Sequence, residues 1–252
     1  MYMKTMVSKK NLLEGLQKVS KSTTKGTLDN IMKGVFIEAE GNSLILRGTD
    51  LDISIESIIE AEVIESGKIL VDCKLLLEII RKLADGDISM EDTENDLSII
   101  CGKSNFTVMK MNEKEFPAFP KLEEYSSTIK VNAETLKQKI QAVSFAAAKD
   151  ESRPILQGIL FELKQNTLTL VALDGYRMSI SKVDVESNSE CSCVLNGTHS
   201  NVVNILEKEI EISFSNNHIV FASENLKVIC RLLEGNYVNY SALINVESKF
   251  NV

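Results

Sequence analysis

The sequence predicts an α+β fold built from two copies of one unit, and three observations lead to this prediction. A shift of 124 residues, which carries Val7 onto Val131, aligns similar residues in the first part of each copy, and the second parts align after small slips. Each copy contains stretches with apolar residues at helical spacing and stretches in which apolar and polar residues alternate. At 252 residues the chain is long enough for two domains of ordinary size, each with its own hydrophobic core.

The repeat is clearest in the first part of each copy, where the alignment needs no gap. The matched pairs there include Leu12 and Leu136, Gln17 and Gln141, Ser20 and Ser144, Lys25 and Lys149, Gly34 and Gly158, Asn42 and Asn166, and Asp50 and Asp174. After small slips, further pairs are Met111 and Leu232, Glu113 and Glu234, Phe116 and Tyr237, and Phe119 and Tyr240. A unit of about 120 residues is longer than a solenoid repeat, so each copy should be a domain. The expected domains span residues 1–125 and 126–252.

Two helices are predicted in each copy. The first opens the copy, with Leu12, Leu16 and Val19 at helical spacing in the first copy and a matching set from residue 136 to residue 143 in the second. The second helix should cover residues 74–83 and end at Asp85-Gly86, and its counterpart should cover residues 200–208.

Strands fill the rest of each copy. Residues 35–40 and 43–46 alternate between apolar and polar and are separated by Gly41-Asn42, which is typical of a hairpin turn. The second copy repeats this pattern over residues 159–163 and 167–170, and more strand-like sequence runs over residues 52–63. The expected order of elements in each copy is therefore a helix, several strands, a second helix and further strands, with the two helices packed on one face of an antiparallel sheet.

Charge is distributed unevenly between the predicted helices and the remainder. The net charge of −8 argues at first against nucleic acid as a partner. The four predicted helical segments, residues 7–25, 71–83, 131–153 and 195–208, nevertheless carry 13 Lys and Arg against 7 Asp and Glu. A mildly basic helical face on an acidic body suits loose, salt-sensitive and sequence-independent contact with phosphates. Ordinary solvated helix faces are the alternative interpretation.

Composition narrows the functional class. No apolar run approaches the roughly 18 to 20 residues of a membrane helix, and the N-terminus lacks a signal-peptide core, so no membrane partner and a cytoplasmic location are expected. The five cysteines have no metal-like spacing and are expected to be buried or half-buried free thiols: Cys73, Cys101, Cys191, Cys193 and Cys230. No cofactor is expected.

Catalytic motifs are not apparent. Gly102-Lys103-Ser104 ends like a phosphate-binding loop, but Leu97 stands where its first glycine should be. Asp50 and Asp52 are better explained by a turn than by a metal site, since no third ligand can be identified. The chain is predicted to be a binding or structural protein and not an enzyme.

Several segments resemble the motifs of one family, in the family's order. They are Gly48-Thr49-Asp50-Leu51-Asp52-Ile53, Glu115-Phe116-Pro117, Asp150-Glu151-Ser152-Arg153-Pro154, Leu173-Asp174-Gly175-Tyr176-Arg177-Met178 and Leu232-Leu233-Glu234-Gly235-Asn236-Tyr237. The segment from Leu173 to Met178 resembles the Thr-Asp-Gly-His-Arg-Leu segment of bacterial DNA sliding clamps, the beta subunits of DNA polymerase III. The resemblance runs from about Met3 to Ile244 and implies the first two of the family's three domains, with the third expected to be absent.

The resemblance also implies a function. Sliding clamps associate head to tail into a ring of six similar domains that encircles double-stranded DNA without regard to sequence. Expected partners are therefore DNA, the DNA polymerase III catalytic subunit, the clamp loader and other clamp-binding peptides. By position, the peptide groove would include Leu156, Leu173, Gly175, Tyr176, Arg177, Met178, Val238 and Leu243. By position, DNA contacts would fall at Lys21, Lys25, Lys149 and Arg153.

The chain departs from the family in ways that leave three interpretations open. Leu173, Tyr176 and Val238 replace the family's Thr, His and Pro in the groove, and the chain stops where the third domain should begin. It could be a fragment of an ordinary clamp, or a two-domain clamp of which three chains restore six domains. It could also be a clamp-derived interaction protein that binds partner peptides without encircling DNA.

Overall fold

A capped strand-to-helix unit recurs three times in the chain. The computed structural model describes residues 2–23, 30–120, 125, 127–150 and 152–244. Within these residues β1 (Lys4–Ser8), β6 (Gly67–Asp72) and β10 (Ser127–Asn132) run directly into α1 (Lys9–Val19), α2 (Cys73–Lys82) and α3 (Ala133–Ser144). The last residue of each strand is the helix N-cap, and its side chain accepts a hydrogen bond from a backbone N–H of the first turn. Such a cap satisfies an otherwise unpaired donor and so sets where each helix begins.

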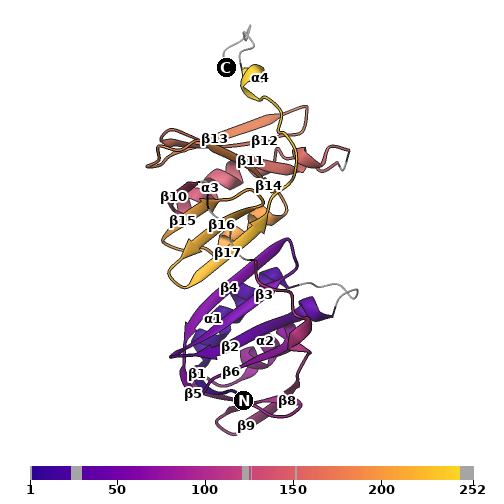
Figure 1. Cartoon of the computed structure of the whole chain (residues 1–252), viewed down its shortest axis with the longest axis vertical. Coiled ribbons are helices and arrows are strands. Elements are labelled where there is room, and N and C mark those ends of the chain that lie inside the picture. Colours follow the sequence, from indigo (N-terminus) through magenta and orange to yellow (C-terminus); the bar gives the residue numbers. More distant parts are fainter. Residues whose placement is uncertain (1, 24–29, 121–124, 126, 151, 245–252) are drawn as a thin grey trace.

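The other elements fall into two halves of the chain, shown in Figure 1 as a lower indigo-to-magenta half and an upper orange-to-yellow half. The N-terminal half adds η1 (Ser20–Ser22), η2 (Ile31–Lys33), β2 (Gly34–Glu40), β3 (Ser43–Thr49), β4 (Ile53–Glu60), β5 (Glu62–Glu65), β7 (Asp87–Asp92), β8 (Asp96–Cys101), β9 (Ser104–Met109) and η3 (Glu113–Glu115). The C-terminal half adds η4 (Pro154–Gln157), β11 (Gly158–Lys164), β12 (Thr167–Leu173), β13 (Met178–Asp184), β14 (Cys191–Asn196), η5 (His199–Ile205), β15 (Glu209–Phe214), β16 (His218–Ser223), β17 (Leu226–Arg231) and α4 (Ser241–Ile244). The elements labelled η are 3₁₀ helices.

Three antiparallel sheets organise these strands. Their orders are β5-β1-β7-β8-β9, β10-β15-β16-β17-β4-β3-β2-β6 and β13-β12-β11-β14. The eight-stranded sheet crosses from one half to the other, because β17 pairs with β4 and places Val228 opposite Ile55. Both of these side chains are fully buried. The two halves are therefore joined by a continuous hydrogen-bonded sheet with an apolar seam.

The internal repeat is confirmed in three dimensions. The β2–β3 hairpin pairs Ala39 with Leu44, and the β11–β12 hairpin pairs Leu163 with Leu168, which is the same pairing shifted by 124 residues. The predicted hairpin turns, the first helix of each copy and the second helix of the first copy are all present. The α+β fold class and its tandem repeat are thus correct.

Three details of the predicted fold were wrong. A strand, not a helix, opens each copy, because β1 and β10 precede α1 and α3. Each copy contributes to two sheets and not to one. The helix predicted over residues 200–208 is the 3₁₀ helix η5, whose N-cap Thr198 makes no side-chain capping bond. Its sequence contains Val202-Val203 and two asparagines, which have low helix propensity, so an α-helix gains little there.

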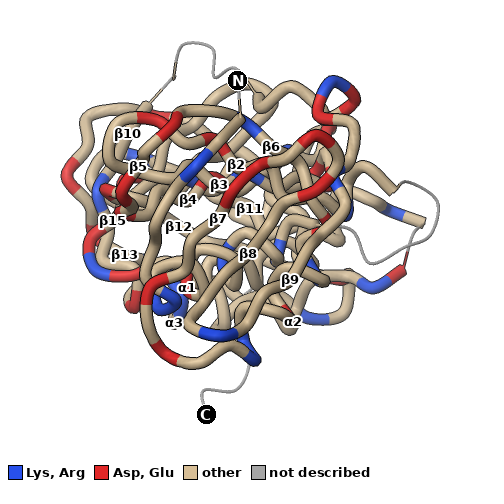
Figure 2. The backbone as a smooth tube through the Cα atoms, turned by 90° about the horizontal axis from the view of Figure 1, so that it is seen from below, with Lys and Arg blue, Asp and Glu red and all other residues tan. Residues whose placement is uncertain are grey.

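The helices lie on one side of the sheets. The helix α1 packs against β3, β4 and α2, while α3 packs against β12, β13 and η5. Figure 2 shows α1, α2 and α3 on the same side of the molecule, with Lys and Arg among them. Among the described residues no helix is both long and apolar enough to span a bilayer. The tandem arrangement thus gives one helical surface and one sheet surface that run through both halves.

Candidate functional site

A second apolar cluster lies outside the main core, on the C-terminal half. Its buried members are Leu156, Leu160, Val171, Leu173, Val194 and Tyr240, and half-buried side chains packed against them are Ala148, Ile155, Met178, Ile180, Leu233 and Tyr237. Ala148 lies between α3 and η4, and the others come from η4, from all four strands of the β13-β12-β11-β14 sheet and from the segment after β17. We call this set the second apolar cluster.

A tight turn at the edge of the second apolar cluster contains three of the predicted groove residues, Gly175, Tyr176 and Arg177. The Asp174 carboxylate accepts hydrogen bonds from the backbone N–H groups of Tyr176 and Arg177 at 3.0 and 3.1 Å, and from Arg177 Nε at 2.9 Å. These bonds hold the pKa of Asp174 below its ordinary value. Gly175 has φ +93°, a conformation that favours glycine. The turn leaves the Tyr176 side chain fully exposed, while the Arg177 guanidinium lies 5.6 Å from the centroid of the Phe145 ring.

The segment after β17 covers part of the second apolar cluster and is anchored by two tyrosines. The Tyr240 hydroxyl donates to the Glu162 carboxylate on β11, and the Tyr237 hydroxyl lies 3.4 Å from the Val171 carbonyl oxygen. Burial raises the pKa of both tyrosines to about 12. Burial also acts to raise the pKa of Glu162, but hydrogen bonds from Tyr240 and Lys164 outweigh it, and the pKa lies below its ordinary value.

The structure brings most of the predicted groove residues to one surface. Leu156 and Leu173 are buried members of the second apolar cluster, and Met178 packs against it half-buried. Val238 and Leu243 are 41% and 50% exposed and flank Tyr240 on the covering segment. Together with the turn at Gly175, these residues form an apolar floor bordered by exposed apolar side chains and by Arg177, which is ion-paired. A surface of this kind suits an apolar peptide.

Sequence reasoning missed several members of this surface, most clearly Tyr237 and Tyr240. The repeat offered a signal for them, since it aligns Tyr237 with Phe116 and Tyr240 with Phe119. Phe116 stacks on Phe36 of the β2–β3 hairpin with ring centroids 5.5 Å apart. The aromatic residues after the last strand therefore pack on the equivalent hairpin in both copies.

Three of the four predicted DNA contacts lie in the described residues, each close in sequence to a helix. Lys21 is exposed in η1, directly after α1, and Lys149 and Arg153 are exposed between α3 and η4. Lys21 lines an open pocket with Lys18 and with Arg81 of α2, two cations that the predicted set did not include. The pocket also contains Glu14 and Glu207, so its charge is mixed. Lys25 lies outside the described residues.

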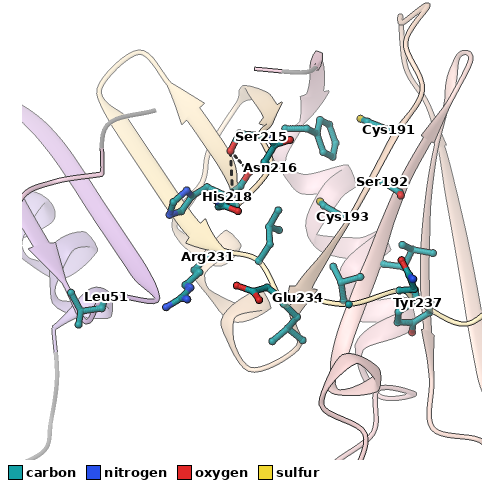
Figure 3. Close-up of a pocket in the computed structure, with 18 residues that line it drawn as sticks. Leu51, Cys191, Ser192, Cys193, Ser215, Asn216, His218, Arg231, Glu234 and Tyr237 are labelled. Atoms are coloured by element: carbon teal, nitrogen blue, oxygen red, sulfur yellow. Dashed lines mark hydrogen bonds between the residues drawn. The ribbon is translucent and has the colours of Figure 1, made fainter. Parts of the chain in front are cut away.

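A different pocket, of about 990 Å³, opens between β14 and the hairpins of β15, β16 and β17 (Figure 3). Polar groups dominate the labelled residues, and Ser215 Oγ donates to the backbone carbonyl of His218 at 3.0 Å. Arg231 and Glu234 enter from β17 and the segment that follows it, and Leu51 of the N-terminal half lies at the rim. The pocket contains none of the predicted groove residues.

The described residues form no metal-binding cluster, and their buried thiols are not activated. No group of three or more His, Cys, Asp or Glu side chains among the described residues is placed to hold a metal ion. Burial raises the pKa of the Cys73 and Cys230 thiols to about 12 and also raises that of Cys193. Such thiols stay protonated at neutral pH and are poor nucleophiles. The Asp50 carboxylate accepts from the backbone N–H groups of Asp52 and Ile53, as a turn residue does.

Comparison with known proteins gives a consistent result. Residues 3–120 match the sequence model of the DNA polymerase III beta subunit, N-terminal domain, and residues 130–239 match that of its central domain. The beta sliding clamp of Bacillus subtilis (strain 168) is 29% identical over 265 residues, covering 99% of this chain and 70% of the relative. The beta sliding clamp of Halalkalibacterium halodurans is 30% identical, covering 94% of this chain and 67% of the relative.

Solved structures agree with the sequence matches. The structure of a putative DNA polymerase III beta subunit from Eubacterium rectale superimposes with a TM-score of 0.91 at 32% identity, covering 97% of this chain and 68% of the other. The sliding clamp structure from Bacillus subtilis gives a TM-score of 0.93 at 27% identity, covering 99% of this chain and 69% of the other.

Proposed function

Because the chain belongs to the DNA polymerase III beta subunit family, the bacterial sliding clamps, we propose that it is a processivity factor that encircles duplex DNA and tethers a polymerase to it. The proposal takes residues 1–125 and 126–252 as two clamp domains that act without catalysis. Such a factor would work on bacterial DNA in the cytoplasm.

The observation that carries the proposal is the continuous sheet. The β17–β4 pairing joins two copies of one unit so that α1, α2 and α3 lie on the same side. If further units join in the same way, the sheets form an outer wall and the helices line a hole. Basic side chains just after those helices, such as Lys21 after α1 and Lys149 after α3, would then meet phosphates. Contacts of this kind are sequence-independent and salt-dependent, so they permit sliding while topology keeps the clamp in place.

The second apolar cluster and the turn from Asp174 to Arg177 are the proposed docking groove. Buried Leu156 and Leu173 would form its floor, and exposed Val238 and Leu243 its wall. Partners would be a leucine- or phenylalanine-rich peptide of the DNA polymerase III catalytic subunit, of the clamp loader or of other clamp-binding proteins. Tyr176 is fully exposed at the rim and can pack on such a peptide without rearrangement of the core.

Primer extension on a long single-stranded circular template tests the tethering function. With clamp loader, polymerase and a trap for released polymerase, adding the chain should lengthen the products made in one binding event. Met178→Ala should shorten them again, because it removes an apolar contact from the proposed groove. Ile64→Ala, on β5 of the other half, should not. Products of unchanged length with the unsubstituted chain would contradict the proposal.

A further inference from the structure

The pocket beside β14 is bordered by a turn that the two copies of the repeat share. In the second copy, Ser215 Oγ accepts a hydrogen bond from the backbone N–H of His218 at 3.1 Å. In the first copy, Thr93 Oγ1 accepts one from the backbone N–H of Asp96 at 3.2 Å, with both residues 122 positions earlier. The two turns are therefore equivalent, and the surroundings of one can be compared with those of the other.

The first copy fastens this turn with an ion pair that the second copy lacks. Lys110 Nζ donates to the Asp92 carboxylate at 2.7 Å and also to the Thr93 carbonyl. At the same shift of 122 residues, Leu232 stands in place of Lys110 and Phe214 in place of Asp92, so no ion pair can form between these positions. Beside the turn of the second copy lies the pocket of about 990 Å³, a size typical of binding sites (Figure 3).

The pocket contains part of a free strand edge. β14 is the last strand of its sheet, and the backbone N–H of Leu233 donates to the Val194 carbonyl at 2.9 Å, on the side away from β11. Backbone groups of alternate residues in a strand point to the same side, so the N–H and C=O of Ser192 also point away from β11. Ser192 lines the pocket, and the described residues supply no backbone partner for it on that side. Such an edge is a template for pairing with another strand.

Carboxylates outnumber cations around this edge. Glu234 lines the pocket, Asp52 follows its rim residue Leu51, and Glu190 directly precedes β14. All three carboxylates are exposed, and within the part of the chain that the structure describes none of them forms an ion pair. Of the described residues that line the pocket, Arg231 is the one Lys or Arg. The balance of charge therefore favours a basic ligand.

We propose that this pocket is a second docking site, which takes an extended, basic peptide segment of a partner protein as an added strand on the edge of β14. One residue of the peptide accepts a hydrogen bond from the Ser192 N–H and donates one to the Ser192 carbonyl, and a Lys or Arg side chain of the peptide lies against Glu234. In strand addition of this kind, backbone bonds supply affinity and side-chain contacts select the sequence. The pocket contains none of the predicted groove residues, and its occupation does not require the chain to encircle DNA.

Amide NMR with a synthetic peptide tests the site on the unsubstituted chain. The probe is acetyl-Thr-Val-Lys-Val-Thr-amide, and the same peptide with norleucine in place of lysine is the neutral control. The lysine peptide should shift the amide signals of Ser192 and Glu234 and slow the hydrogen exchange of the Ser192 N–H. The norleucine peptide should bind about two- to fivefold more weakly, as the loss of one exposed ion pair implies. Signals that shift at Tyr176 and Val238 instead, no shift at millimolar peptide, or equal affinity of the two peptides would overturn the proposal.

Substitutions separate the backbone contact from the charge. Ser192→Pro removes the N–H that the peptide needs, and an edge strand tolerates proline where that N–H faces outward, so affinity should fall about tenfold while the fold persists. Ser192→Ala is the matched control, because it keeps the N–H and should bind as the unsubstituted chain does. Unchanged affinity in Ser192→Pro, or an equal loss in Ser192→Ala, would overturn the strand addition.

Glu234→Gln changes only an exposed side chain, so it decides the case even if Ser192→Pro fails to fold. This variant should bind the lysine peptide no more tightly than the norleucine peptide, because the carboxylate that selects the basic side chain is gone. A preference for lysine that survives the substitution would overturn the proposal.

Discussion

Replacing Tyr240 by Phe should loosen the segment that carries Val238 and Leu243. The substitution removes one hydroxyl and keeps the ring that fills the second apolar cluster, where Tyr240 is 9% exposed. It therefore leaves packing intact and deletes the hydrogen bond to the Glu162 carboxylate. Among the described residues, that bond is the only polar contact between the Tyr240 side chain and the sheet beneath it.

The size of the effect follows from the surroundings of Glu162. A hydrogen bond to a charged group contributes roughly 1.5–3 kcal/mol. The Glu162 side chain is 16% exposed and also pairs with Lys164 at 2.9 Å, so its charge keeps a partner and some water when Tyr240 is lost. We expect Tyr240→Phe to lower the free energy of unfolding by about 1 kcal/mol, which is about 2–4 °C in Tm for a chain of this length.

The pH dependence of this loss has a definite sign. The pKa of Glu162 is lowered in the folded protein, so the stabilisation is present above the ordinary value of 4.5 and is lost as pH falls through the lowered pKa. The pKa of Tyr240 is raised to about 12, so the unsubstituted protein should also lose stability as pH rises from 10 towards 12. Urea unfolding of both proteins between pH 3 and pH 9 should show a difference at pH 7 that shrinks in acid.

Tyr237→Phe is the matched control for Tyr240→Phe. Its hydroxyl lies 3.4 and 3.5 Å from two backbone carbonyl oxygens and has a further hydrogen bond with the backbone of Leu173. All of these partners are uncharged, so removing the hydroxyl should cost only about 0.5 kcal/mol, and that loss should not change in acid. Equal losses for the two variants, or a loss for Tyr240→Phe that does not change with pH, would refute the role given to the bond between Tyr240 and Glu162.

Other substitutions test the remaining parts of the account. Leu173→Ala empties a buried position of the second apolar cluster and should lower the free energy of unfolding by about 2–3 kcal/mol in urea titrations; a loss near zero would mean that the position is not packed. Val228 is buried at the apolar seam between the halves, so Val228→Ala should lower the free energy of unfolding by about 1–2 kcal/mol. In calorimetry the two halves should then unfold in separate transitions, and an unaltered single transition would count against the seam. Lys21→Glu should weaken DNA binding equally for all sequences and reduce the slope of log affinity against log salt by about 1, and an unchanged slope would remove Lys21 from the contact surface.

The repeat was the part of the fold that the sequence predicted best. Matching Leu12 with Leu136 and Asn42 with Asn166 placed the helices and hairpins of one copy on those of the other, because both copies keep the same apolar periodicity. The sheet that crosses both halves could not be predicted in this way. It depends on β17 finding β4 across the chain, and a pairing between edges far apart in sequence leaves no local pattern.

The residues of the proposed groove remain a prediction from the family resemblance. The structure places three of them, Leu156, Leu173 and Met178, in or against the second apolar cluster. Tyr237 and Tyr240 were missed because their role depends on the segment after β17 folding back over the β11–β12 hairpin. The hydroxyl of Tyr240 has its partner on Glu162, 78 residues earlier, and only the folded chain brings the two together.

Retention on DNA tests the central claim most directly. The chain, loaded by a clamp loader onto nicked circular plasmid and passed through a sizing column in high salt, should stay with the circles. Cutting the plasmid once should release it, because a ring held by topology slides off a free end while its weak phosphate contacts are screened. Equal retention on circular and linear DNA, or none on either, would contradict the claim that this chain forms a clamp around DNA.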